Sequence, residues 1–167
     1  MRRRTAIKSG LALTTLSILG APFKSMCATA NIEPDKLTYD ASSQLQFWLE
    51  TSLKRVYPNS KPGEKKALKI IAAKNERVSL QACVRNYSTD SAVVKCELIH
   101  DTDSTLMVRR VGYVPVIQLN TYTPKSDLEG IGHIPGLCPD PLFPDNQVHI
   151  GPESNGVFWI TLQIPEH

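Results

Sequence analysis

The clearest pattern in the sequence is the alternation of apolar and polar side chains in RVSLQACVRN, residues 77–86. Successive side chains of an extended chain point to opposite faces, so a period of two residues predicts a half-buried strand. The apolar members of the pattern are Val78, Leu80, Ala82 and Val84. The turn YSTDSA and the β-rich segment VVKCELI follow, and together with residues 77–86 they predict an antiparallel hairpin.

Four other segments are rich in β-branched and aromatic residues, namely 45–58, 67–73, 106–119 and 156–165. The first can form either a strand or a short helix, and Pro58 ends it in both cases. Pro115 predicts that the third lies at the edge or at a bend of a sheet. Residues 120–155 are predicted to be mostly connection. Several short strands without a helical period predict an all-β fold, an antiparallel β-sandwich of immunoglobulin-like or jelly-roll-like type, over residues 45–167.

Residues 1–30 have the layout of a secretory signal peptide. A basic start, MRRRTAIKSG, precedes the apolar run LALTTLSILGAPF, and small residues lead to a predicted cleavage between Ala30 and Asn31. Arg3 and Arg4 indicate the twin-arginine type of bacterial export signal, and the alternative is an ordinary signal with a basic start. We therefore expect an exported bacterial protein, periplasmic or extracellular.

The charge balance changes when this leader is removed. The leader holds five of the 19 Lys and Arg residues and none of the 16 Asp and Glu residues, which leaves 14 basic residues in the mature chain. Nucleic-acid binding depends on a basic surface, so this balance predicts no nucleic-acid partner. Residues 31–44 are polar and aperiodic, and we interpret them as a linker. No apolar run reaches the ~20 residues that a spanning helix needs, so we predict no stable membrane insertion.

Three cysteines remain after the predicted cleavage, and an odd number cannot form a complete disulfide framework. Cys83 and Cys96 lie on two consecutive predicted strands and are a candidate disulfide; the alternative is a pair of buried thiols. Cys138 is then left without a partner. No Cys-x-x-Cys or His-x-x-x-His spacing occurs, so we predict neither a metal site nor a cofactor.

The segment GLCPDPLFPDN, residues 136–146, holds three prolines between apolar and acidic residues. Each proline fixes its own φ and favours an extended conformation in the residue before it. We interpret the segment as a stiff strap across the end of the sandwich, with Leu142 and Phe143 packed on the sheet. In this interpretation Asp140 orients a turn through backbone N–H groups.

Five segments, taken in order, resemble the N-terminal β-sandwich domain of glycoside hydrolase family 123 and its uncharacterised relatives. They are FWLETSLKRVYPN, AAKNERVSLQACVRN, RRVGYVPV, PGLCPDPLFP and VFWITLQIP, and they span roughly residues 45–165. The matching residues are Trp48, Ser52, Lys54, Val56, Pro58, Ala73, Asn75, Glu76, Gln81, Val84, Arg85, Arg110–Val114, Pro139–Leu142, Pro144, Trp159, Ile164 and Pro165. Cys138 departs from the pattern, since the family is expected to have an aromatic residue there.

The resemblance implies a sandwich that precedes a catalytic barrel. In that family the barrel hydrolyses β-linked N-acetylgalactosamine with an adjacent Asp-Glu pair, and the acetamido group of the substrate is the nucleophile. A barrel needs ~200 residues or more, and no Asp-Glu dipeptide occurs in this sequence. We therefore predict that this chain has no catalytic residues and is not an enzyme.

Two functions remain as hypotheses. The first is a non-catalytic module, part of a truncated or split glycosidase, which supports or docks to a barrel domain through an apolar patch or a free strand edge. The second is a stand-alone carbohydrate-binding or adhesion module, in which Tyr113, Tyr122, Trp159 and Asp140 stack on a glycan or hydrogen-bond it. Asp140 and Tyr113 are the candidate binding residues, and the alternative for Tyr113 and Trp159 is a place in the core.

Overall fold

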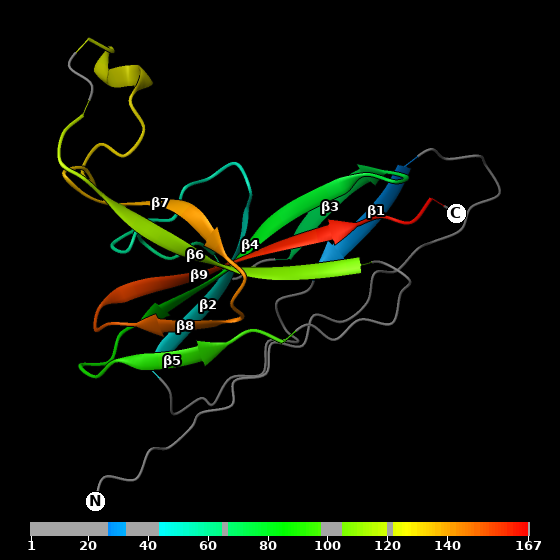
Figure 1. Ribbon diagram of the computed structural model, residues 1–167, viewed down its shortest axis with the longest axis horizontal. Coiled ribbons are helices and arrows are strands. Elements are labelled where there is room, and N and C mark those ends of the chain that lie inside the picture. The colour runs from blue at the N-terminus through cyan, green and yellow to red at the C-terminus, as the bar shows by residue number, and fades with distance from the viewer. Residues whose placement is uncertain (1–26, 33–43, 65–66, 98–104, 120–121, 167) are drawn as a thin grey trace, which may run out of the picture.

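The computed structural model describes residues 27–32, 44–64, 67–97, 105–119 and 122–166 (Figure 1). This part of the chain contains no α-helix, and its strands pair in antiparallel sheets. The predicted all-β, sandwich-like fold is therefore confirmed. The same residues include no helix long and apolar enough to cross a membrane.

The elements of the described chain are short strands and one 3-10 helix. The strands are β1 (Cys27–Ile32), β2 (Leu45–Thr51), β3 (Leu68–Ala73), β4 (Arg77–Asn86), β5 (Ala92–Lys95), β6 (Thr105–Val116), β7 (Gly136–Phe143), β8 (Gln147–Ile150) and β9 (Ser154–Gln163); the 3-10 helix is η2 (Lys125–Asp127).

The largest sheet has five strands in the order β2-β4-β9-β6-β7. At its centre β4 pairs with β9 without interruption, from Arg77 opposite Gln163 to Asn86 opposite Ser154. Strand β6 pairs with β9 through its first half and with β7 through its second half. Two smaller sheets, β5-β8 and β1-β3, lie towards opposite ends of the large sheet in Figure 1.

The main core lies between the large sheet and residues of the smaller sheets. Leu80, Ala82 and Val84 of β4 face this core and are buried, as their alternation predicts. They pack with Phe47, Leu49, Ala72, Val94, Cys96, Val148, Ile150, Phe158, Ile160, Leu162 and Ile164. Removing a large apolar side chain from water contributes about 1.5–3 kcal/mol, so this two-layer packing is the main source of stability.

A second core covers the opposite face of the large sheet. Trp48, Cys83 and Val157 point to this side and pack with Val56, which comes from the loop after β2. We call residues 52–64 the cover loop. Cys83 is only 1% exposed, so β4 is buried on both faces. The prediction of a half-buried strand is therefore corrected, because the cover loop shields the second face from solvent.

Buried polar groups hold the cover loop in place. Nε2 of Gln81 donates hydrogen bonds to the backbone oxygens of Thr51 (2.7 Å) and Lys54 (2.6 Å). A Cβ atom on Gly63 would come within 2.6 Å of Cδ1 of Trp48. The loop therefore approaches the indole at a distance that only glycine allows.

The predicted hairpin between residues 77–86 and the next segment is wrong. Strand β5 pairs with β8, whereas β4 lies between β2 and β9. Val94 and Cys96 face the main core from the second layer. The apolar pattern identifies the buried face of a strand but not its partner, and this is why the pairing was mispredicted.

Most of residues 122–155 lie outside strands, in line with the predicted connection, but the segment also contains β7 and β8. The proline-rich segment forms β7 at the edge of the large sheet, so the predicted strap is a strand. Prolines are tolerated at such an edge since no further strand needs their missing N–H groups. Pro115 lies in the half of β6 that pairs with β7 alone, which confirms its predicted place at an edge.

Strand β1 spans the predicted cleavage point. Ala30 lies opposite Ile70, and Asn31 lies opposite Lys69. The signal peptide itself stays a prediction, since residues 1–26 lie outside the described residues, as do residues 33–43 of the predicted linker.

Candidate functional site

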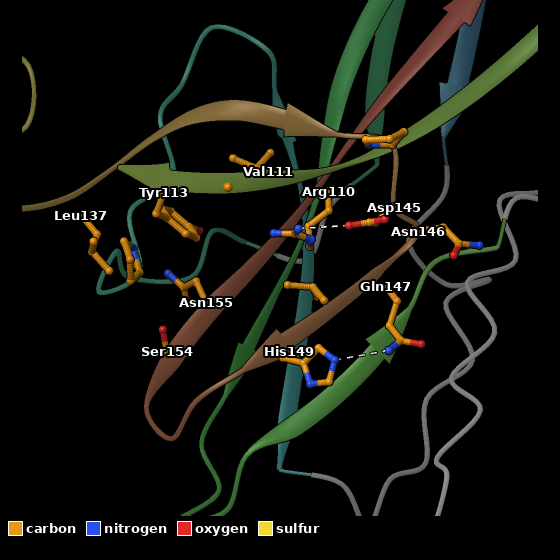
Figure 2. A pocket seen from close by; sticks show the side chains of 14 residues that line it. Arg110, Val111, Tyr113, Leu137, Asp145, Asn146, Gln147, His149, Ser154 and Asn155 are labelled. Carbon is orange, nitrogen blue, oxygen red and sulfur yellow. Dashed lines mark hydrogen bonds and ion pairs between the residues drawn. The ribbon is translucent and has the colours of Figure 1, made fainter. Parts of the chain in front are cut away.

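An open groove of about 1010 Å³ lies beside the second half of β6. Figure 2 shows that β6, β7, β8 and the start of β9 all contribute side chains to it. The lining residues are Pro58, Arg110, Val111, Gly112, Tyr113, Leu137, Pro144, Asp145, Asn146, Gln147, Val148, His149, Ser154 and Asn155. Most of these side chains are polar or small, so the groove offers hydrogen-bonding groups rather than an apolar surface.

The charged groups of the groove form an ion pair. Nη2 of Arg110 lies 3.0 Å from Oδ2 of Asp145, and the dashed line in Figure 2 marks this pair. The guanidinium carbon also lies 4.4 Å from the centroid of the Phe143 ring. These two contacts fix the Arg110 side chain and leave the lining of the groove with little net charge.

Tyr113 forms part of one wall and is half-buried. Its hydroxyl donates a hydrogen bond of 3.4 Å to the backbone oxygen of Val56. Burial, and to a smaller extent the nearby Cys83, raise the pKa of the Tyr113 phenol above its ordinary value. The phenol is therefore neutral across the physiological pH range.

Strand β8 places polar side chains on the groove because its residues alternate. Val148 and Ile150 point into the main core, whereas Gln147 and His149 are exposed. Nε2 of Gln147 lies 3.4 Å from Nε2 of His149, as Figure 2 shows. The alternation that builds the core on one side therefore also supplies the polar lining on the other.

Asn155 fixes the wall opposite β8. Its side chain is buried, and Nδ2 donates hydrogen bonds of 2.8 Å to the backbone oxygens of both Tyr57 and Ser60. The backbone N–H of Asn155 donates to the oxygen of Pro58 at 2.9 Å. These bonds hold the cover loop against β9 and place Pro58 on the rim of the groove.

The two predicted binding residues do not come together. Tyr113 lines the groove, but Asp140 lies on β7, is exposed and does not line it. Within the described residues Asp140 has no hydrogen-bond or ion-pair partner, so its expected role in orienting a turn is not borne out. Leu142 and Phe143 are also exposed, at 39% and 40%, rather than packed down as predicted.

The other aromatic candidates lie elsewhere. Trp159 packs against the second core, in line with the alternative interpretation of a core residue. Tyr122 is 97% exposed on the segment between β6 and β7.

The predicted bridge between Cys83 and Cys96 is not formed. Both are free thiols, and they belong to the cores on opposite faces of the large sheet. Burial raises the pKa of both, to about 12 for Cys96, which keeps them protonated. Cys138 is a half-buried free thiol on β7, with Sγ 4.0 Å from Nη1 of Arg55.

No group of three or more His, Cys, Asp and Glu side chains in the described residues is arranged to hold a metal ion. Arg110, Asp145, His149 and Asn155 were not predicted as site residues. Their meeting depends on the register of β6 with β7 and on the pairing of β8 in the second layer. Periodicity along the sequence carries no signal for either.

Besides the groove, the structure exposes a projecting arm. We call residues 113–119 and 122–139, which include the ends of β6 and β7, the arm; Figure 1 shows it extending beyond the rest of the large sheet. Four of its apolar side chains are exposed, Val114 (36%), Ile117 (85%), Ile131 (53%) and Leu137 (47%). Val114 pairs with Cys138 and Pro115 pairs with Leu137, so Val114 and Leu137 lie on opposite faces of the arm and both faces expose apolar groups.

The arm is attached to the cover loop at its base. The His133 and Tyr57 rings stack in parallel with centroids 4.2 Å apart, and Nδ1 of His133 lies 2.5 Å from Oδ1 of Asn59. Nε of Arg55 lies 3.1 Å from Oε2 of Glu129. These contacts hold the base of the arm in a defined position.

No protein-family model matches this chain, and no curated protein matches it. The resemblance to the N-terminal domain of glycoside hydrolase family 123 therefore stays an expectation from the sequence.

Proposed function

We propose that this chain is a non-catalytic, exported β-sandwich module that docks to a partner domain through the arm. The observation that carries the proposal is the exposure of Val114, Ile117, Ile131 and Leu137 on one projecting element. Because the sequence resembles the N-terminal domain of glycoside hydrolase family 123, in which a catalytic barrel follows the sandwich, we expect the partner to be a barrel domain.

The geometry of the arm suits a docking role. Its base is fixed by the stack of His133 on Tyr57 and by the ion pair of Arg55 with Glu129. A prearranged apolar surface loses little conformational freedom on binding, so more of the contact energy appears as affinity. Interfaces of this kind depend on a few apolar anchors near their centre, and Ile117 and Leu137 are the natural anchors here.

Titration calorimetry of the purified mature chain against an isolated barrel domain of this family tests the proposal. We expect the double substitution Ile117→Ser and Leu137→Ser to weaken binding at least about tenfold, which corresponds to about 1.4 kcal/mol. Leu53→Ser is the matched control, since Leu53 is 92% exposed but lies off the arm. No binding by the wild type, or equal losses in variant and control, would contradict docking through the arm.

A second candidate function is carbohydrate binding, and the groove favours it. The Arg110–Asp145 pair leaves its lining nearly neutral, while Gln147, His149 and Ser154 offer hydrogen bonds. A neutral, polyhydroxylated ligand matches such a lining better than an ion does. Protein sites for sugars combine polar groups of this kind with an aromatic wall, here Tyr113.

Calorimetric titration with N-acetylgalactosamine oligosaccharides tests this second candidate. We expect Asp145→Ala to abolish sugar binding. Because Asp145 is exposed, the melting temperature should stay nearly unchanged. Asp140→Ala, an exposed aspartate outside the groove, serves as the control and should bind like the wild type. A wild-type protein that binds no sugar at millimolar concentration rules this candidate out.

A further inference from the structure

Two residues that each hold an unpaired buried polar atom lie opposite each other where β4 pairs with β9. Arg85 and Asn155 are register partners in this pair, so their side chains share one face of the sheet. Nε of Arg85 and Oδ1 of Asn155 are both buried and have no hydrogen-bond partner among the described residues. The first is only a donor and the second is only an acceptor, and a buried group of either kind is costly to leave unpaired.

The remaining polar atoms of both side chains are already engaged. Nη1 of Arg85 donates to the oxygen of Pro58 at 3.3 Å, and Nη2 donates to Oε2 of Glu153 at 3.0 Å. Nδ2 of Asn155 donates to two backbone oxygens of the cover loop. Both hydrogen-bond partners of Nδ2 are acceptors, so the orientation of the Asn155 amide is fixed and Oδ1 cannot exchange places with Nδ2. Neither side chain can turn towards the other without breaking these bonds.

The same two strands contain a matched pair that makes the contact directly. Arg77 and Gln163 are also register partners, and Nε of Arg77 donates to Oε1 of Gln163 at 2.6 Å. Glutamine is longer than asparagine by one methylene group. The shorter Asn155, anchored to the cover loop, does not reach its arginine in the same way.

We infer that one water molecule is bound between Nε of Arg85 and Oδ1 of Asn155. The site needs a molecule that accepts a hydrogen bond from the arginine and donates one to the amide. Water does both, whereas an anion has no proton for Oδ1, and a cation is repelled by the guanidinium group. Buried waters of this kind make two to four hydrogen bonds to otherwise unsatisfied groups.

The position of this water gives it a structural role that does not depend on the proposed function. Arg85 and Asn155 together hold the cover loop through the oxygens of Tyr57, Pro58 and Ser60. The water would join the two side chains that hold the loop. Because Pro58 and Asn155 line the groove, these contacts also set the position of that wall.

A crystal structure of the purified protein, at a resolution that shows ordered water, tests the inference directly. We expect one density peak within hydrogen-bonding distance of both Nε of Arg85 and Oδ1 of Asn155. Solution NMR gives a second measurement, in which Hε of Arg85 shows a rotating-frame cross peak to water of the sign that marks contact rather than exchange. A direct bond between the two side chains, or the absence of both signals, would overturn the inference.

A pair of variants provides the control. In Asn155→Leu the cross peak between Hε of Arg85 and water should disappear, because Oδ1 no longer holds the molecule. In Gln163→Leu, which removes the direct partner of Arg77 at the other end of the same strand pair, the Arg85 cross peak should persist. Persistence of the cross peak in Asn155→Leu would overturn the inference, and if that variant does not fold, the wild-type density decides.

Discussion

Gly112 shows how much one residue can determine at the sheet edge. The register of β6 with β7 shifts between Val111 and Tyr113, and Gly112 occupies this irregularity. A Cβ atom there would collide with the Phe143 ring and would come within 2.9 Å of Cγ of Pro141. Phe143 in turn supports the guanidinium group of Arg110, so the absence of a side chain at residue 112 shapes the groove.

We predict that Gly112→Ala lowers the free energy of unfolding by about 1–3 kcal/mol, the usual cost of inserting a methyl group into a filled space. Urea unfolding measures this change. Gly151→Ala is the matched control, because a Cβ atom at Gly151 meets nothing within 4 Å. Equal stability of the two variants would show that Phe143 moves aside without cost.

Tyr113 makes stability depend on pH at the alkaline end. Its pKa is raised in the folded protein, mainly by burial. In the unfolded chain the phenol loses its proton near pH 10, while the folded state keeps it. Above about pH 10 the folded state therefore binds more protons than the unfolded state does, and the free energy of unfolding falls as the pH rises. Below that range Tyr113 contributes no pH dependence.

We expect Tyr113→Phe to make this alkaline loss of stability shallower. Chemical unfolding at a series of pH values from about 8 to 11, with wild type and variant side by side, measures the difference. Tyr122→Phe is the control, since Tyr122 is 97% exposed. An identical pH dependence in wild type and Tyr113→Phe would exclude Tyr113 as its source.

Among the elements, β7 is protected against further strand pairing by Pro139. Antiparallel partners alternate between hydrogen-bonded and non-hydrogen-bonded pairs. Pro115 has no N–H group, so its pair with Leu137 is of the second kind, and so is the pair of Tyr113 with Pro139, two residues further along. The ring nitrogen of Pro139 therefore lies on the outer side of β7, where it removes a donor from a free edge.

We predict that Pro139→Val raises the aggregation rate several-fold at high protein concentration. The substitution restores an outward N–H group to an edge strand that already exposes Leu137 and Leu142. Light scattering over time measures the rate. Pro152→Val, at an exposed position outside the strands, is the control, and an unchanged rate in Pro139→Val would contradict protection by this proline.

The sequence predicted which segments become strands better than it predicted how they pair. The alternation of residues 77–86 and of residues 156–165 identified the two central strands. The hairpin of β4 with β5 was wrong, since Val94 faces the core from another layer. Strand β7 was missed because prolines usually indicate turns, and only the finished sheet shows that β7 lies at an edge.

The groove was less predictable than the strands. Tyr113 was identified as a binding candidate and does line the groove, but Asp140 does not. Arg110 meets Asp145 only because β6 and β7 pair in one particular register. A register that places residues 35 positions apart in contact arises from the packing of the whole sheet and leaves no local pattern.

At the scale of the whole molecule, each face of the large sheet is covered by a core that buries a cysteine. The reactivity of these two thiols therefore measures global unfolding. Cys83 and Cys96 are each 1% exposed, in different cores, whereas Cys138 is half-buried at the edge. We predict that iodoacetamide labels Cys138 in the native protein and labels the other two only after denaturation. Peptide mass spectrometry measures each site. Native Cys83 and Cys96 recovered as a disulfide would contradict the structure.

The position of β9 determines when this protein can fold during its synthesis. It is the last of the described strands, yet it lies in the middle of the large sheet, between β4 and β6. Residues 77–86 leave the ribosome long before residues 154–163, with which they pair. Until β9 emerges, β4 and β6 each present an unpaired edge, so the nascent chain needs protection throughout that interval. A ribosome that stalls shortly before residue 154 therefore holds a chain that lacks the centre of its sheet.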